Sequence, residues 1–294
     1  MSETFQHLLY EKDGRIARIT LNRPDRLNAI ASGMPREIAR AVELANEDDD
    51  IHVIVLTGAG RAFSAGYDLK DFAERRGNNQ GAQAADADGR PWDPMVDFNM
   101  MFANTKDFMS LWRSYKPTIA KVRGFAVAGG SDIALCCDLV VMAEDAKIGY
   151  PPARVWGCPT TAMWAYRLGV EKAKRMLLTG DLITGKEAAD MGLVLEAVSE
   201  ERLDARVDEL AERMAGVPRN QLMMQKLMLN RAVEQMGMET TQMIATLFDG
   251  ITRHSPEGMW FKEMAEEKGF QDAVKMRDGG APIAEGVSRP TYKF

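Results

Sequence analysis

Cysteine and histidine are scarce in this chain, with three residues of each among 294. An odd number of cysteines, two of them adjacent, does not indicate a disulfide framework. We expect Cys136, Cys137 and Cys158 to be buried thiols without a chemical role. The histidines lie far apart in the sequence without metal-ligand spacing, and no serine–histidine nucleophile motif is present. The sequence therefore favours neither a zinc site nor histidine-based hydrolysis.

Long apolar runs and basic tracts are also missing. The longest hydrophobic runs, such as VIVL and LVVMA, have the length of strands and are far shorter than a membrane span. The net charge is −6 with acids and bases interspersed, so nucleic acid and anionic membranes are poor partners. The first residues, MSETFQHLLYEKDG, are too polar and acidic for a secretion or transit signal. We therefore expect a cytoplasmic protein.

What the chain does contain is a regular alternation of strand and helix patterns up to about residue 198. RIARITLN and IHVIVLTG predict strands, and apolar residues at helical spacing predict a helix over 32–46. From residue 199 onward the patterns are wholly helical. We therefore predict an α/β core over 1–198, which binds the substrate, and a helical domain over 199–294. The polar segment 75–94 predicts a long mobile insertion.

Further helical patterns within the core extend over 94–115, 131–137 and 159–169. In the C-terminal part, methionine is dense between residues 214 and 264. Because methionine is a flexible apolar side chain, we expect this face to pack in the core or at a subunit interface. A monomer is therefore not expected.

Two glycine-rich turns each follow a predicted strand and lie about sixty residues apart. They are LTGAGRAFSAGYDLK and GFAVAGGSDIALCCD, and neither contains a dinucleotide or phosphate-binding signature. Such turns expose backbone N–H groups where no bulky side chain blocks approach. Two of these groups from separate loops, aimed at one oxygen, would form an oxyanion hole. Asp132, in the second turn, is then either an acid–base residue or a helix cap.

Taken together, these segments resemble the crotonase superfamily, the enoyl-CoA hydratase/isomerase family. The resemblance covers nearly the whole chain in order and rests on ITLNRPDRLNAI, VIVLTGAGRAFSAGYDLK, KPTIAKVRGFAVAGGSDIALCCD, AKIGYPPARVWGCPTTAMWAYRLG and LLTGDLITGKEAADMGLVLEAV. It implies a spiral of strand–strand–helix (ββα) repeats with a C-terminal helical trimerisation domain, and so a homo-oligomer, either a trimer or a dimer of trimers. It also implies an acyl-CoA thioester substrate, with coenzyme A as part of the substrate and no metal or redox cofactor.

The same resemblance places the oxyanion-hole donors at the backbone N–H groups of Tyr67 and Gly129. They would hold the thioester oxygen as it becomes an enolate, and one such donor is typically worth about 3 kcal/mol. Arg26 and Lys70 carry charges that suit the phosphates of coenzyme A, although either is equally well explained as a solvated surface charge. The full set of residues expected to bind the substrate is Arg26, Leu27, Ala65, Gly66, Asp68, Lys70 and Pro152.

Two acid–base positions depart from the family pattern. Hydratases of the family use two glutamates, one to activate water and one to handle the proton at the α-carbon, and these positions are Asp132 and Pro152 here. Aspartate is one methylene shorter than glutamate, and proline has no acid–base group at all. The dienoyl-CoA isomerase branch has an aspartate at the position of Asp132, but it carries further acids where this chain has Pro152 and Thr160.

Asp132 is therefore the candidate acid–base residue. We expect an enzyme that hydrates a 2-enoyl-CoA, or dehydrates the product, in fatty-acid or related acyl-CoA metabolism. The alternatives are an enoyl- or dienoyl-CoA double-bond isomerase, a hydrolase, and an acyl-CoA-binding homologue impaired in catalysis because Pro152 replaces the second glutamate. Trp156 stands where relatives often carry glycine, so we also expect a narrowed acyl pocket.

Overall fold

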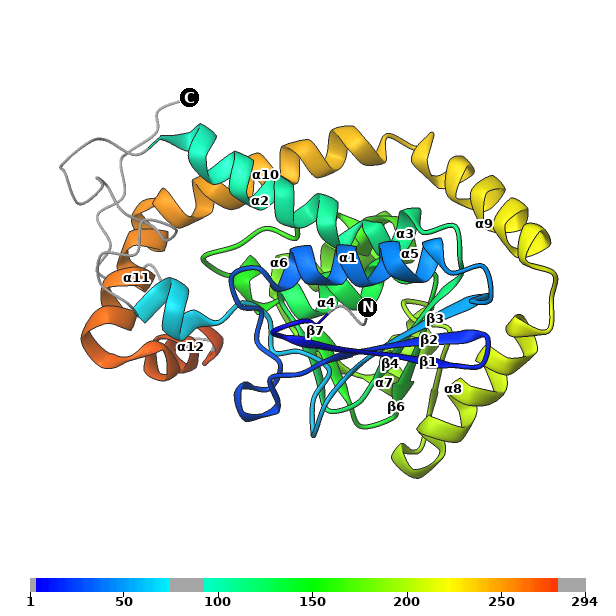
Figure 1. Cartoon of the computed structure of the whole chain (residues 1–294). Helices are drawn as coiled ribbons and strands as arrows, with labels where there is room; N and C mark the ends of the chain where they lie inside the picture. The colour runs from blue at the N-terminus through cyan, green and yellow to red at the C-terminus, as the bar shows by residue number, and fades with distance from the viewer. Residues whose placement is uncertain (1–3, 75–92, 280–294) are drawn as a thin grey trace.

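The computed structural model describes residues 4–74 and 93–279. A six-stranded sheet in the order β1–β2–β3–β4–β6–β9 forms its centre (Figure 1). β1 and β2 pair antiparallel, whereas the other neighbours pair parallel. The strands are β1 (Leu8–Asp13), β2 (Ile16–Leu21), β3 (Val53–Gly58), β4 (Thr118–Val122), β6 (Leu139–Ala143) and β9 (Glu196–Val198).

A smaller sheet of three strands, in the order β5–β7–β8, lies against the first. Its strands are β5 (Phe125–Val127), β7 (Lys147–Gly149) and β8 (Leu182–Thr184). The chain passes from β4 directly into β5 and from β6 directly into β7, and a helix follows each pair. This succession is the repeat of two strands and a helix that the sequence pattern predicts.

β3 illustrates why these segments form strands. Val53, Ile54, Val55 and Leu56 are all buried. An uninterrupted run of β-branched and aliphatic residues is typical of a parallel strand that is covered on both faces. The strand predicted from IHVIVLTG is therefore confirmed, beginning at Val53.

Helices cover the sheets of the core. In α1, five buried apolar side chains recur every three or four residues, so one face packs on the sheet: Met34, Ile38, Ala41, Val42 and Ala45. The core helices are α1 (Met34–Glu47), α2 (Pro94–Phe108), α3 (Ser110–Arg113), α4 (Gly129–Cys136), α5 (Met163–Leu168), α6 (Val170–Thr179) and α7 (Gly185–Met191). Three shorter helical turns are η1 (Pro24–Arg26), η2 (Lys70–Glu74) and η3 (Pro151–Ala153).

Three predicted helices have different bounds in the structure. The helix expected over 94–115 is divided into α2 and α3. The helix expected over 159–169 begins only at Met163, because Ala162 adopts a left-handed backbone with φ 56° that interrupts regular helical geometry. The helix expected over 131–137 starts earlier, at Gly129.

Most of the predicted insertion, residues 75–92, lies outside the described residues. The last two residues of the predicted insertion, Asp93 and Pro94, form the N-terminus of α2. The carboxylate of Asp93 accepts a hydrogen bond of 2.9 Å from the backbone N–H of Met95, and Pro94 is the first residue of α2. An aspartate cap followed by proline is a strong local signal for a helix N-terminus.

Beyond Val198 the described chain is helical. α8 packs along the large sheet, α9 leads away from it, and α10 returns beside α2 (Figure 1). α11 and α12 then lie next to η2. These helices are α8 (Glu200–Ala215), α9 (Arg219–Glu234), α10 (Met238–His254), α11 (Pro256–Lys268) and α12 (Phe270–Asp278). No helix among the described residues is both long and apolar enough to cross a membrane.

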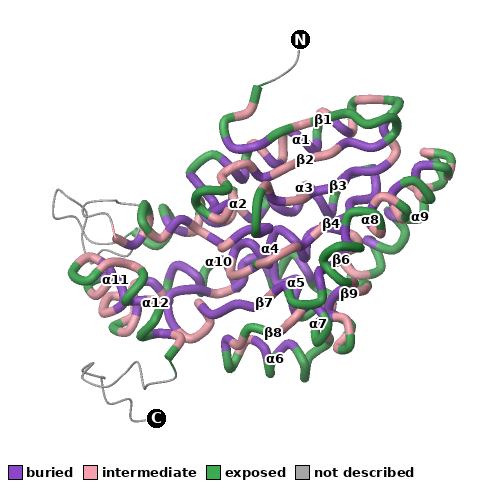
Figure 2. The backbone as a smooth tube through the Cα atoms, turned by 90° about the horizontal axis from the view of Figure 1, so that it is seen from below, coloured by how far each residue is buried: buried purple, intermediate pink, exposed green. Residues whose placement is uncertain are grey.

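Buried residues are concentrated in the strands and in α4, whereas α9 is largely exposed (Figure 2). A second, smaller hydrophobic cluster joins η2 to α11 and α12 through Ala73, Phe261 and Ala273, and Trp156 of the core belongs to it as well. This cluster fixes the last two helices against the loops of the core. The C-terminal helices therefore help to enclose a cavity together with the loops of the core.

Candidate active site

A cavity of about 690 Å³ opens between the loops of the core and the C-terminal helices. Its walls come from the turn after β3, the start of α4, η3, α10 and α12. Apart from Gly66, every residue predicted for the site lines this cavity: Arg26, Leu27, Ala65, Tyr67, Asp68, Lys70, Gly129, Asp132 and Pro152. The fold thus brings together residues that are up to 126 positions apart in the printed sequence.

The two glycine-rich loops touch one another at the cavity wall. Gly66 has φ +88°, and a Cβ atom added there would lie 2.8 Å from the carbonyl oxygen of Val127 and 3.3 Å from the amide nitrogen of Gly129. Only glycine combines this left-handed backbone with such a close approach. Although Gly66 itself does not line the cavity, it brings the segment with Tyr67 against the start of α4.

The backbone N–H groups of Tyr67 and Gly129 are available to a ligand. Neither donates a hydrogen bond to another residue within the described part of the chain. Gly129 is the first residue of α4, where a helix leaves its N–H groups without intrahelical acceptors and carries a partial positive charge. The preceding Ala128 has φ 53° and ψ −126°, an uncommon conformation for a residue with a side chain. Strain of this kind is typical of a functional loop.

The Tyr67 side chain is held firmly behind these amides. Its hydroxyl lies 3.3 Å from the amide nitrogen of Asn104, and its ring packs edge-on against Phe72 and at a tilt against Phe108. Burial raises the pKa of the phenol well above its ordinary value. The ring also lies so close to Gly129 that an added Cβ there would meet it at 3.0 Å. The side chain of Tyr67 therefore stays uncharged and forms a fixed part of the cavity wall.

Asp132 is buried in the first turn of α4, and its side chain does not cap the helix. Its Oδ1 instead accepts a hydrogen bond of 2.6 Å from the hydroxyl of Thr161. Burial raises the pKa of this carboxyl to about 8, while the hydrogen bond from Thr161 acts in the opposite direction. A carboxyl that titrates near neutral pH in a cavity is suited to general acid–base catalysis.

Thr161 was not found by sequence reasoning. It follows η3 in the turn before α5, and its carbonyl oxygen accepts a hydrogen bond of 2.9 Å from the side chain of Gln242 on α10. A C-terminal helix therefore holds the residue that orients Asp132. The neighbouring Thr160, which the family comparison had singled out, instead lies with its hydroxyl 2.7 Å from that of Thr105.

Asp249 and Arg253 also line the cavity, and sequence reasoning missed both. They lie four residues apart on α10 and form a buried ion pair, and Arg253 has a second ion pair of 3.3 Å with Asp97. The backbone N–H of Cys158 donates a hydrogen bond of 3.0 Å to Oδ1 of Asp249. An acid and a base spaced i, i+4 on a predicted helix were the available signal.

Trp156 lines the cavity, as does Pro152. Its backbone has φ 82°, which is rare for a bulky residue, and its ring lies 5.2 Å from the ring of Phe261 on α11. Arg277 on α12 lies over the opposite part of the Phe261 ring, 5.6 Å from its centre. An aromatic side chain thus forms part of the cavity wall, and the narrowed acyl pocket expected from the sequence stays a prediction.

The cationic rim consists of Arg26, Arg61 and Lys70, all of which are exposed. Asp68 is different, because it is buried and engaged within the protein. Its carboxylate pairs with Arg23 at 3.0 Å and accepts a hydrogen bond of 3.2 Å from the backbone N–H of Lys70. Asp68 therefore stabilises the conformation of the loop that carries Lys70.

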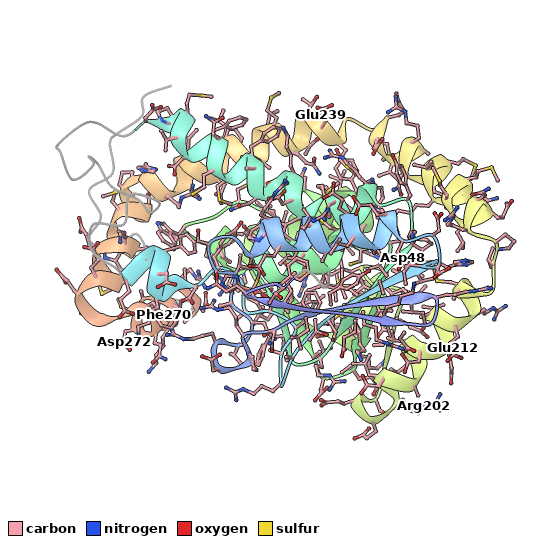
Figure 3. The ribbon with its side chains drawn as sticks, viewed as in Figure 1. Asp48, Arg202, Glu212, Glu239, Phe270 and Asp272 are labelled. Carbon is pink, nitrogen blue, oxygen red and sulfur yellow. The ribbon has the colours of Figure 1, made fainter. Side chains whose placement is uncertain are left out.

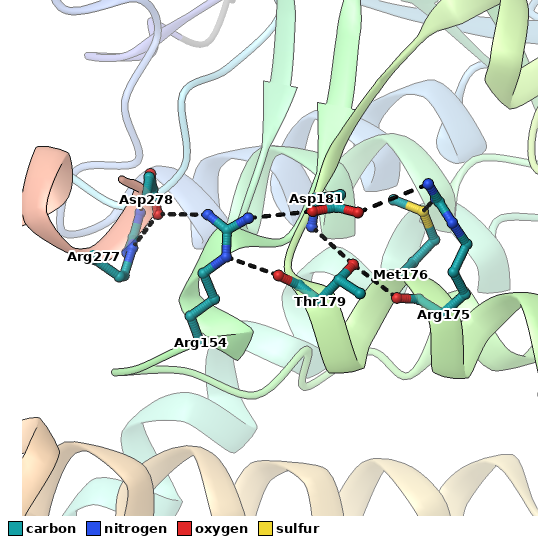
Figure 4. Close-up of polar contacts among 7 residues, drawn as sticks. All are labelled: Arg154, Arg175, Met176, Thr179, Asp181, Arg277 and Asp278. Atoms are coloured by element: carbon teal, nitrogen blue, oxygen red, sulfur yellow. Dashed lines mark hydrogen bonds and ion pairs between the residues drawn. The ribbon is translucent and has the colours of Figure 1, made fainter. Parts of the chain in front are cut away.

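The last helix closes one side of the cavity. Phe270 begins α12 beside η2 (Figure 3), and its backbone N–H lies 3.3 Å from the carboxylate of Glu74. At the other end of α12, Asp278 pairs with Arg154 of the core at 3.3 Å (Figure 4). Arg154 also pairs with Asp181 at 3.3 Å. This pair of attachments holds α12 over the cavity.

The scarce cysteines and histidines are not part of the cavity wall. Burial raises the pKa of Cys137 and of Cys158 to about 12, so both thiols stay protonated at neutral pH. His7 pairs with Glu37 at 3.0 Å, far from the cavity. Among the described residues, no group of three or more His, Cys, Asp or Glu side chains is arranged to hold a metal ion.

The ββα spiral, with two free amides beside a buried carboxylate, defines a member of the crotonase class of enzymes. The family model for enoyl-CoA hydratase/isomerase matches residues 11–271, and the chain belongs to that family. The fold class predicted from the sequence is thereby confirmed, and the protein is an enzyme of the hydratase/isomerase family.

Individual proteins show the same relationship. A crystal structure of an enoyl-CoA hydratase from Mycobacterium smegmatis is 47% identical, covers 94% of both chains and superimposes with a TM-score of 0.87. A Dictyostelium discoideum protein named "Probable enoyl-CoA hydratase, mitochondrial" is 31% identical over 85% of each chain. A "Probable enoyl-CoA hydratase" from Rhizobium meliloti is 31% identical over 87% of this chain and 94% of that protein.

Proposed function

We propose that the protein catalyses the reversible hydration of a 2-enoyl-CoA. The observation that carries this proposal is that the free N–H groups of Tyr67 and Gly129 share one cavity with the buried carboxyl of Asp132. Addition of water to a conjugated thioester places negative charge on the thioester oxygen, which two such donors stabilise in a site with little water. Asp132 exchanges a proton with the water or hydroxyl at the β-carbon. The enoyl-CoA hydratase names of the relatives support the same reaction class.

The substrate then lies along the cavity from its charged rim to its aromatic end. Arg26, Arg61 and Lys70 surround the rim and suit the phosphates of coenzyme A. The thioester lies at the two amides, and the acyl chain points toward Trp156. Coenzyme A serves only as part of the substrate in this scheme, because the thioester and the amide donors together make the α-carbon acidic.

A direct assay tests the proposal. Crotonyl-CoA and longer 2-enoyl-CoAs lose their absorbance when the conjugated double bond is hydrated. We expect the wild-type protein to hydrate at least one of them, and Asp132→Asn to lose about a hundredfold or more in kcat. Equal activity of wild type and Asp132→Asn, with acyl-CoA still bound, would remove Asp132 from the mechanism.

A double-bond isomerase is the second candidate, and Pro152 is the observation that favours it. With no acid at that position, one carboxyl can still carry a proton between the α- and γ-carbons of a 3-enoyl-CoA. Incubation with 3-enoyl-CoA, followed by chromatography, would separate a 2-enoyl product from a 3-hydroxy product. Release of free coenzyme A in the same experiment would indicate a hydrolase, and binding without turnover would indicate an impaired homologue.

We also propose that the protein is a homo-oligomer whose subunits meet on α9 and α10. These helices expose several large apolar side chains, as is common at subunit interfaces: Met224, Leu227, Met228, Met243, Ile244, Leu247, Phe248 and Ile251. Light scattering should give the mass of a trimer or of a dimer of trimers. Ile244→Glu should dissociate it, whereas Leu178→Glu, at an exposed apolar position on α6, should not.

A further inference from the structure

The cavity contains a second buried carboxylate besides Asp132, and it comes from the C-terminal helix α10. Asp249 is 3% exposed and lines the cavity, although the printed sequence places it 117 positions after Asp132. The carboxylates of Asp132 and Asp249 are close enough for the charge of Asp249 to raise the pKa of Asp132. The site therefore has a pair of carboxyl groups even though Pro152 supplies none.

Asp249 faces the same point as Pro152. A Cβ atom added at Gly157 would lie 2.7 Å from Cβ of Pro152, 3.4 Å from the hydroxyl of Tyr150 and 3.6 Å from Oδ1 of Asp249. One small region next to Gly157 is thus bordered by the proline and by the carboxylate. A functional group missing from residue 152 can be supplied there from α10.

The two carboxyl groups have different hydrogen-bonding partners. Asp249 has an ion pair with Arg253 on one oxygen and a hydrogen bond from the backbone N–H of Cys158 on the other, and both partners stabilise its anion. Asp132 is buried and accepts a single hydroxyl hydrogen bond, from Thr161. Two neighbouring carboxyl groups in such different surroundings are a common arrangement for an acid and a base.

We propose that Asp249 is the second acid–base residue of this site and handles the proton at the α-carbon. This inference rests on the proposed binding of an acyl-CoA thioester at Tyr67 and Gly129. In dehydration, the Asp249 carboxylate takes the α-proton, and the electron pair of the broken C–H bond forms the enolate held by the two amides. The enolate then forms the α,β double bond while the neutral carboxyl of Asp132 protonates the departing hydroxyl as water. Hydration follows the same steps in reverse, from the state in which Asp249 is protonated and Asp132 ionised.

Exchange of the α-protons of butyryl-CoA for deuterium, measured by NMR in D₂O, isolates the step assigned to Asp249. Butyryl-CoA has no β-hydroxyl, so the exchange needs the two amides and a base but no leaving-group acid. We expect wild type to catalyse exchange and Asp249→Asn to lose about a hundredfold or more. Asp132→Asn should retain most of the exchange while losing hydration of crotonyl-CoA.

Asp97→Asn is the matched control, because it removes the other carboxylate paired with Arg253 while leaving the cavity wall intact. It should keep exchange within about threefold of wild type, and thermal unfolding should show that all variants are folded. If Asp97→Asn and Asp249→Asn lose α-proton exchange equally, the role of Asp249 is to pair with Arg253 and not to act as the base, and the inference is overturned. Should Asp249→Asn unfold, Asp249→Glu would decide, because it keeps the base: retained exchange would support the inference and lost exchange would overturn it.

The two proposals fail in different ways. If wild type hydrates crotonyl-CoA and Asp249→Asn does so equally well, the role of Asp249 is wrong and the hydratase proposal stands. If wild type exchanges α-protons through Asp249 but hydrates no enoyl-CoA, the hydratase proposal is wrong and the role of Asp249 stands. Absence of both activities in wild type would overturn both.

Discussion

The hydroxyl of Thr161 donates a hydrogen bond of 2.6 Å to Oδ1 of Asp132, and this bond stabilises the ionised form of the buried carboxyl. Burial and the charge of Asp249 raise the pKa of Asp132, and the hydrogen bond from Thr161 limits how far above its ordinary value the carboxyl titrates. The acid–base group from α4 is therefore tuned by a residue that Gln242 of α10 holds in place.

Replacing Thr161 by valine keeps the shape of the side chain and removes the donor. Because the lost hydrogen bond favoured the carboxylate, the pKa of Asp132 should rise further, by about one unit. The pH at which hydration reaches half its maximum should move upward by the same amount, as measured from kcat between pH 6 and 10. Thr160→Val is the control, since its hydroxyl contacts Thr105 and not Asp132. An unchanged profile in Thr161→Val would show that Asp132 does not control the rate.

The two directions of the proposed reaction should depend on pH with opposite signs. Hydration needs Asp132 as a carboxylate, so the ionisation of Asp132 should raise kcat for hydration as the pH passes through about 8, the pKa given by burial. Dehydration needs the neutral acid, so its kcat should fall through the same range. The ionisable groups that interact with Asp132 are Tyr67, Cys136, Tyr150, Cys158 and Asp249, and Arg253 pairs with Asp249. Rates that rise with pH in both directions would contradict this assignment.

The raised pKa of Asp132 also has a consequence for stability. An acid whose pKa is higher in the folded state than in the unfolded state stabilises the fold at low pH, and this contribution is lost as the pH rises from about 4 to about 8. Asp132→Asn cannot ionise, so its gain in stability over wild type should be larger at pH 8.5 than at pH 5. Urea unfolding at both pH values measures the difference. A gain that is no larger at pH 8.5 would argue against a buried, ionisable carboxyl.

Gly129 lacks room for a side chain. A Cβ atom there would lie 2.8 Å from Cδ1 of Ile30 and 3.0 Å from the ring of Tyr67. Gly129→Ala should therefore displace one or both amide donors and lower kcat by about 10²–10³-fold, as expected for the loss of an oxyanion-hole donor. Gly216→Ala is the control, because its added Cβ would make only an ordinary contact of 3.5 Å. Wild-type kcat in Gly129→Ala would exclude these amides from catalysis.

Arg154 connects α12 to the core (Figure 4), where its guanidinium pairs with both Asp278 and Asp181. These pairs are partly exposed, and each is worth under about 1 kcal/mol. Arg154→Ala should loosen α12, whose residues line the cavity, and raise KM for acyl-CoA about three- to tenfold with a smaller change in kcat. Arg175→Ala is the control. The guanidinium of Arg175 lies 3.7 Å from the carboxylate of Asp181, a longer ion pair, so this variant should leave KM unchanged. A fall in kcat alone would indicate that Arg154 acts on the chemical step instead.

Much of the core follows from local patterns in the sequence. The apolar run of β3, the amphipathic spacing of α1 and the glycines of both turns each depend on neighbouring residues, so the printed order of residues is enough to predict them. Among the wall residues, Asp132 was singled out from its place in the second turn, whereas Tyr67 and Gly129 were identified within the turns by the family resemblance. The family resemblance then supplied their expected roles.

Other elements carried weaker local signals. β1 was not predicted because it is an edge strand in which only Leu8 is fully buried, so alternation is faint. β5 and β8 have three residues each, too few for a periodic pattern. The predicted start of the helix that begins at Met163 was too early, because no feature of the preceding threonines indicates the left-handed backbone of Ala162.

By itself, then, the sequence determined the alternating core, the helical C-terminal part, the two glycine-rich loops and the single carboxyl at Asp132. Only the tertiary structure decided what surrounds that carboxyl. Asp249 reaches the cavity and Thr161 reaches Asp132 because α10 folds back beside α2 and the turn before α5 lies next to α4. These are contacts between segments far apart in the chain. Burial and hydrogen bonding across such contacts set the pKa of Asp132 and add a second carboxylate. No local pattern encodes them, because they depend on which surfaces meet when the chain folds.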